Sequence, residues 1–185
     1  MDKLFDEWKK STPKYDKKLE HLFISLTRKG GGAEIDREDK GKIFSNNYEL
    51  YIYAFFLGLY NNKYEELPET AELKDFSHAI QHWGSTKSYV REDFTNLQEY
   101  LFMAVIAKTD DIEDDLIELD KGKKTVEAIK KRLHITMQNY TNGGLLFLEK
   151  KIQEENLDIT LGTSMLNLIL QSKQETEKML SGVSL

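Results

Sequence analysis

The side chains that come closest to a metal site in type and spacing are Asp75, His78 and His82. Spacings of three and four residues place them on one face of a helix, where a carboxylate and two imidazoles can bind a single ion. A metal-dependent hydrolase also needs a general base, which the H-E-x-x-H pattern supplies from its glutamate, but this chain has Ala79 at that position. We therefore favour the plainer interpretation of two histidines at a solvated helix edge, and keep a metal-dependent hydrolase as a rival hypothesis.

A run of basic residues offers a different chemistry, contact with phosphate groups. Five cations, which we call the basic face, lie just before or on the polar side of a helix expected over residues 126–140: Lys123, Lys124, Lys130, Lys131 and Arg132. Residues 110–120, the acidic segment, hold seven acidic side chains and no basic one, and the whole chain has a net charge of −6. The sequence thus predicts at most weak, sequence-independent contact with DNA. We favour the alternative that the basic face neutralises the acidic segment or is an ordinary solvated surface.

The acidic segment resembles a calcium-binding loop in composition only. Such a loop needs glycine at its sixth position and glutamate at its twelfth. Counted from Asp110, these positions hold Asp115 and Lys121. We therefore expect residues 110–120 to form a solvated connector, and we expect the protein to have no cofactor.

Three glycines at positions 30–32 suggest a phosphate-binding loop, but the pattern fails in detail. That loop ends in glycine, lysine and then serine or threonine, whereas Gly41 and Lys42 are followed here by Ile43. The surrounding residues combine glycine with dense charge and offer little to a hydrophobic core. We expect a flexible loop near residues 29–42.

The composition indicates which fold must position these side chains. The chain has 185 residues, two prolines and no cysteine, which favours helices and removes disulfides and cysteine-ligated metals from consideration. Its longest nearly apolar stretch, residues 50–60, is about half of the roughly 20 residues that a membrane-spanning helix needs. We expect a single all-α domain over residues 1–185, a compact bundle of six to eight helices that is cytoplasmic and does not enter a membrane.

Hydrophobic spacing places two helices at the centre of this bundle, over residues 48–60 and 94–108. The first has too few polar residues to offer a solvated side. It should therefore bury four large apolar side chains: Ile52, Phe55, Phe56 and Leu59.

The remaining helices follow from the same periodicity. The sequence Thr-Asn-Gly-Gly at residues 141–144 predicts a turn that ends the helix of residues 126–140, and a new helix should begin at Leu145. The other expected helices are two near the N-terminus, one over residues 73–83 that carries the two histidines, and one over residues 163–180.

Two segments resemble a family of small bacterial proteins encoded beside DNA phosphorothioation genes, the Dnd system-associated proteins of unknown activity. They are KIFSNNYELYIYAFFLGLYNN at residues 42–62 and MQNYTNGGLLFLEKKI at residues 137–152. The second segment contains the four residues most typical of that family: Tyr140, Asn142, Gly143 and Gly144. The resemblance implies an accessory role near DNA modification or phage defence. A helical hairpin with a left-handed turn would need the same residues, so we expect their role to be packing.

For function, the sequence favours a non-catalytic accessory or adaptor protein that acts through protein contacts, with weak DNA binding as an additional contact that stays open. The expected partner is another protein or a second copy of the chain. Two alternatives stay open, namely the metal-dependent hydrolase described above and a helical homo-oligomer with a structural role, whose interface is one of the aromatic helix faces.

Overall fold

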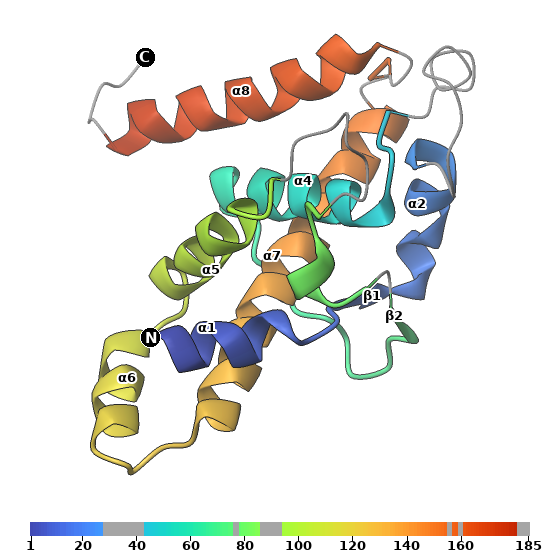
Figure 1. Cartoon of the computed structure of the whole chain (residues 1–185). Coiled ribbons are helices and arrows are strands. Elements are labelled where there is room, and N and C mark those ends of the chain that lie inside the picture. The colour runs from blue at the N-terminus through green and yellow to red at the C-terminus, as the bar shows by residue number, and fades with distance from the viewer. Residues whose placement is uncertain (28–42, 76–77, 86–93, 155–156, 159–160, 181–185) are drawn as a thin grey trace. The chain divides into compact units, whose positions relative to one another are not determined.

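A computed structural model shows a predominantly helical chain (Figure 1). It describes residues 1–27, 43–75, 78–85, 94–154, 157–158 and 161–180. The loop expected near residues 29–42 lies outside these ranges. Contacts group the chain into two compact units: unit 1 comprises residues 1–14 and 75–137, and unit 2 comprises residues 15–74 and 138–185. The prediction of a single domain over residues 1–185 stays a prediction.

Unit 1 has a core of aromatic and aliphatic side chains. Its elements are α1 (Asp2–Lys9), η2 (Ile80–His82), α5 (Leu97–Ala107), α6 (Ile112–Asp120) and the first part of α7 (Val126–Glu154). Helix α1 is amphipathic and buries Leu4 and Trp8 on one face. The ring of Trp8 lies 5.3 Å from the ring of Phe102 on α5, measured between centroids. These contacts hold one side of α5 against α1.

The central helix of unit 2 is α4 (Asn47–Tyr60), which is strongly apolar. The unit also contains η1 (Lys17–Leu19), α2 (Glu20–Leu26), the second part of α7 and α8 (Gly162–Leu180). The carboxylate of Glu49 accepts hydrogen bonds from the Ser45 backbone N–H at 2.7 Å and from the Asn46 side-chain amide at 3.1 Å. These bonds satisfy donors ahead of the helix and help α4 to begin at Asn47. The Tyr53 hydroxyl of α4 donates to the Met165 carbonyl oxygen of α8 at 2.9 Å.

The predicted all-α class is confirmed, with seven α-helices in the described ranges. Within α4, Ile52 and Phe55 are buried as expected, but Phe56 and Leu59 are only half-buried. The helix expected over residues 94–108 is α5, yet Phe94 precedes it and is 41% exposed. None of the helices in the described part of the chain is long and apolar enough to cross a lipid bilayer.

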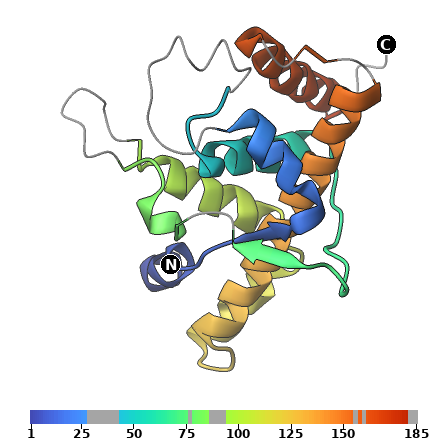
Figure 2. The same ribbon diagram turned by 90° about the vertical axis from the view of Figure 1, so that its right-hand side faces the viewer.

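The prediction of one helix over residues 73–83 is wrong. A short strand, β2 (Leu73–Asp75), pairs there with β1 (Lys14–Asp16), as Figure 2 shows, and η2 follows it. The Ile80 backbone N–H then donates to the Ser11 carbonyl oxygen at 3.1 Å. These hydrogen bonds join residues about sixty positions apart, so helical spacing alone does not reveal them.

The turn predicted at residues 141–144 is also wrong, because α7 continues without a break to Glu154. A Cβ atom built on Gly144 would lie 1.8 Å from the Ala54 carbonyl oxygen of α4, and one built on Gly143 would lie 2.1 Å from the Lys63 carbonyl oxygen. The two glycines therefore let other backbone segments approach α7 closely, and their role is not to end a helix.

Candidate functional site

The three candidate metal ligands do not share a helix face. Asp75 ends β2 and lies 3.8 Å from the Lys14 ammonium, whereas His82 ends the short turn η2. The imidazole rings of His78 and His82 are 6.5 Å apart between centroids and nearly perpendicular. No group of three histidine, aspartate or glutamate side chains within the described ranges is placed to hold a metal ion.

Two cations of the basic face are held by one acidic side chain of unit 1. Lys124 and Arg132 both form ion pairs with the carboxylate of Asp115, which is only 2% exposed. Hydrogen bonds from Lys124 and then Arg132 lower the pKa of Asp115, although burial opposes this shift. Lys124 and Arg132 therefore stabilise a buried charge of their own unit.

Of the other three cations of the basic face, one forms an ion pair and two have no acidic partner in the described ranges. Lys130 lies 2.6 Å from the carboxylate of Glu127, one turn earlier on α7. Lys123 and Lys131 are exposed, and their side chains have no acidic partner among the residues that the structure describes. Two of the five predicted phosphate contacts are thus fully available.

The acidic segment is not a connector, as the sequence suggested, because most of it forms α6. Glu113, Asp114 and Asp115 occupy the first turn of this helix, where negative charge interacts favourably with the free backbone N–H groups. Ile112 is buried and fixes the start of the helix against unit 1. A high density of acids is therefore compatible with a short, well-anchored helix.

The four residues of the family-like motif make contacts within unit 2. Tyr140 packs its ring edge-on against Phe55 at 6.5 Å and against Tyr64 at 5.1 Å between centroids. The side-chain amide of Asn142 donates to the Glu65 carbonyl oxygen at 3.1 Å. Together with the close approach at Gly143 and Gly144 already described, these contacts give every member of the motif a packing role.

The sequence analysis missed an exposed apolar surface on α5. Leu101, Phe102 and Val105 of this helix are buried, but Tyr100 is 66% exposed and Met103 is 58% exposed. Ala107 is also exposed and lies on the same side, because residues three and seven positions apart share a helix face. We call Tyr100, Met103 and Ala107 the α5 face. Apolar residues all around α5 were the signal, which we interpreted as the wide apolar side of a central helix.

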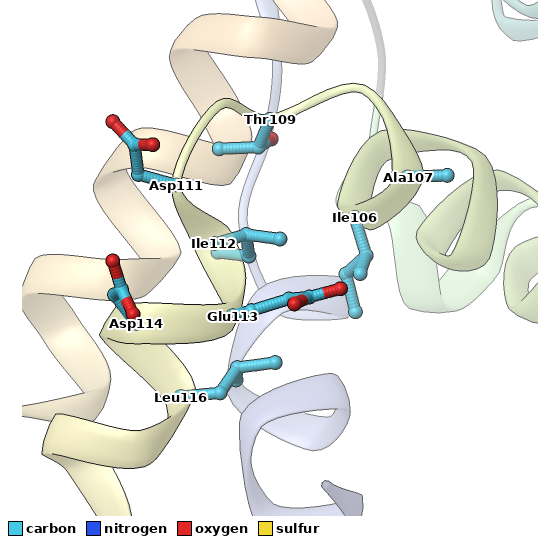
Figure 3. Close-up of a pocket in the computed structure, with 8 residues that line it drawn as sticks. All are labelled: Ile106, Ala107, Thr109, Asp111, Ile112, Glu113, Asp114 and Leu116. Atoms are coloured by element: carbon cyan, nitrogen blue, oxygen red, sulfur yellow. The ribbon is translucent and has the colours of Figure 1, made fainter.

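A hollow of about 420 Å³ lies between the end of α5 and the start of α6, and Ala107 of the α5 face is one of its lining residues. Figure 3 shows Ile106 of α5 and Ile112 and Leu116 of α6 pointing toward one another across it, with the carboxylate of Glu113 among them. The Thr109 hydroxyl, between the two helices, donates to the Val105 carbonyl oxygen at 2.8 Å and so stabilises the connection. The hollow thus combines apolar walls with an accessible negative charge.

The α5 face and this hollow form one candidate site for binding another macromolecule. No protein-family model, curated protein or solved structure matches the chain. The geometry of the candidate site is therefore the basis on which a function can be assigned.

Proposed function

We propose that the protein is a non-catalytic adaptor that binds another protein through the α5 face. The observation that supports this proposal is the exposure of Tyr100 and Met103 on a helix whose other apolar residues form the core of unit 1. Exposed apolar groups gathered on one surface are typical of interaction sites. Tyrosine and methionine are also among the residues enriched at the centres of protein interfaces.

Burial of the α5 face would favour contact with another protein. Burying one large apolar side chain stabilises an interface by roughly 1.5–3 kcal/mol. A few such side chains commonly dominate the binding energy, provided that they are central and surrounded by residues that exclude water. On α5, the exposed polar residues Glu99 and Lys108 lie beside the exposed Tyr100 and Met103.

The proposal includes a role near DNA modification or phage defence. It is supported by the resemblance of residues 42–62 and 137–152 to the Dnd system-associated proteins. Weak DNA contact is also part of it, supported by the exposure of Lys123 and Lys131. A partner with its own affinity for DNA would supply most of the binding energy, since the chain is acidic overall.

Photocrosslinking tests the adaptor function directly. With p-benzoylphenylalanine in place of Tyr100, illumination of cells that naturally make the protein should give discrete covalent adducts with a partner protein, because the reactive ring occupies the interface. The matched control places the same residue at Ala128, which is exposed on α7 outside the α5 face. Mass spectrometry identifies the adducts. Absence of adducts at position 100, or the same adducts from both positions, would contradict the proposal.

Salt-dependent DNA binding tests the second part of the proposal. If Lys123 and Lys131 each neutralise one phosphate, the log–log slope of affinity against salt should be about −1.8, and Lys131→Glu should reduce its magnitude to about 0.9. Fluorescence anisotropy with a labelled duplex measures both slopes. Lys18→Glu is the control, because Lys18 is exposed in unit 2 and lies outside the basic face. An unchanged slope in Lys131→Glu would remove DNA contact at this surface from the proposal.

A further inference from the structure

We infer that the partner presents a basic amphipathic helix, which lies along the α5 face and places a lysine or arginine beside Glu113. This inference rests on the proposed function and specifies the chemistry of the partner. It is carried by the juxtaposition of an exposed apolar surface with acidic side chains that have no cation of their own.

The acidic side chains in and just before α6 differ in whether they have a cationic partner. Asp115 and Glu118 are paired with cations of the same unit, Asp115 with Lys124 and Arg132 and Glu118 with Lys124 at 2.9 Å. In contrast, Asp111, Glu113 and Asp114 have no cationic partner among the residues that the structure describes, and all three line the hollow. Of these three, Glu113 is the one whose carboxylate points toward Ile106 in Figure 3, whereas the carboxylates of Asp111 and Asp114 point away from the apolar walls.

The shape of the surface fits a helix of about two turns followed by an anchoring side chain. The α5 face extends from Tyr100 to Ala107, which corresponds to about 10 Å along the helix axis. The hollow beside it has a volume within the roughly 300–1,000 Å³ of typical ligand pockets, enough for apolar side chains of a bound segment. Amphipathic helices bind such grooves through anchors at positions i, i+3 or i+4, and i+7.

Charge decides between this partner and a second copy of the chain. In a symmetric dimer the same patch contacts itself, and the residues that line the hollow include three acidic ones and no basic one, so a second copy brings no cation from its own hollow to Glu113. A lysine or arginine beside Glu113 instead pairs with a carboxylate that Figure 3 shows between the apolar walls. Partial shielding from water by Ile106 and Leu116 strengthens such a pair.

Selection from a display library of random 16-residue peptides tests the inference with the full chain as bait. The selected peptides should combine apolar residues at helical spacing with neighbouring lysine or arginine. Binding of the strongest synthetic peptide, measured by fluorescence anisotropy, should weaken about tenfold in Glu113→Lys and less in Glu113→Gln. Glu69→Lys is the matched control, because Glu69 is exposed, has no cationic partner in the described ranges and belongs to unit 2, and it should change the affinity less than twofold.

The possible failures separate the two proposals. Selected peptides that are acidic or uncharged, but whose binding is lost in Met103→Asp, overturn the basic partner and keep the adaptor function. A selection without binders, or a Glu113→Lys affinity equal to that of Glu69→Lys, also overturns the inference. The absence of crosslinks at position 100 instead overturns the adaptor function itself. Equal melting temperatures of the Glu113 variants and the unchanged protein confirm that the comparison reports binding.

Discussion

Gly144→Ala should destabilise unit 2 by more than about 3 kcal/mol, the largest effect expected of any single methyl group in this protein. The added Cβ would lie 1.8 Å from the Ala54 carbonyl oxygen of α4, so both helix backbones must move apart. The backbones of α4 and α7 are also close at Gly58 of α4, where an added Cβ would lie 2.0 Å from the Tyr140 carbonyl oxygen of α7. Urea denaturation followed by circular dichroism measures the loss.

The control for this prediction is Gly122→Ala. Gly122 has a φ of +69°, which disfavours alanine by about 1–2 kcal/mol, but a Cβ there would meet no atom within 4 Å. The two substitutions therefore separate the cost of backbone conformation from the cost of steric overlap. A loss for Gly144→Ala no larger than that for Gly122→Ala would mean that α4 and α7 do not approach as closely as described.

Acidification from pH 6.5 to pH 4 should destabilise unit 1 by about 3 kcal/mol through one side chain, His134. Burial lowers the pKa of His134 to about 4, and a hydrogen bond with the Trp8 backbone offsets only part of this effect. Above pH 6.5 the imidazole is neutral in both the folded and unfolded states, so its contribution is constant. Below pH 6.5 the unfolded state binds a proton first, and the free energy of unfolding falls until the folded state also binds one near pH 4.

Thermal denaturation across this pH range tests the prediction, with His134→Gln as the variant. The variant can differ from the unchanged protein in stability at neutral pH. Its stability should nevertheless fall less steeply with decreasing pH, because the titrating group is gone. Identical pH dependence in His134→Gln and the unchanged protein would show that His134 is accessible to protons in the folded state.

Those parts of the fold that depend on local spacing were predictable from the sequence. The run of apolar residues in α4 and the Asn46–Glu49 cap predict a helix whose start agrees with the structure to within one residue. The apolar spacing of Leu4, Phe5 and Trp8 likewise predicts a short helix there, and Leu4 and Trp8 are buried while Phe5 is half-buried. In both helices, the residues that favour helix formation also fill the core, so local preference and tertiary packing agree.

The errors arise where distant backbone segments decide the local structure. Helical spacing between Leu73 and Trp83 is real, but β2 pairs with a strand from the beginning of the chain. The glycines at 143 and 144 suggested a turn because their contacts with α4 and Lys63 cannot be read from the sequence. Both cases follow the rule that tertiary contacts override weak local preferences.

The candidate site was only partly predictable, for a similar reason. Charge spacing singled out the basic face, whose contact with DNA stays a prediction, but the sequence does not show that Asp115 is buried and paired with Lys124 and Arg132. Nor does it show that Tyr100 and Met103 are on the solvent side of a helix that is apolar all around. Which side of such a helix faces solvent depends on what packs against the other side.

The division of the chain into two units also determines the order in which they can be completed during synthesis. Each unit combines two separate stretches of sequence, and residues 1–14 must wait for residues 75–137 before unit 1 can close. At about 5–20 residues per second, translation of the intervening and closing segments takes roughly 6–25 s. Until α5 has been made, Trp8 lacks the ring of Phe102, and it lacks the ring of His134 until the first part of α7 follows. The nascent chain therefore exposes part of its hydrophobic core during synthesis.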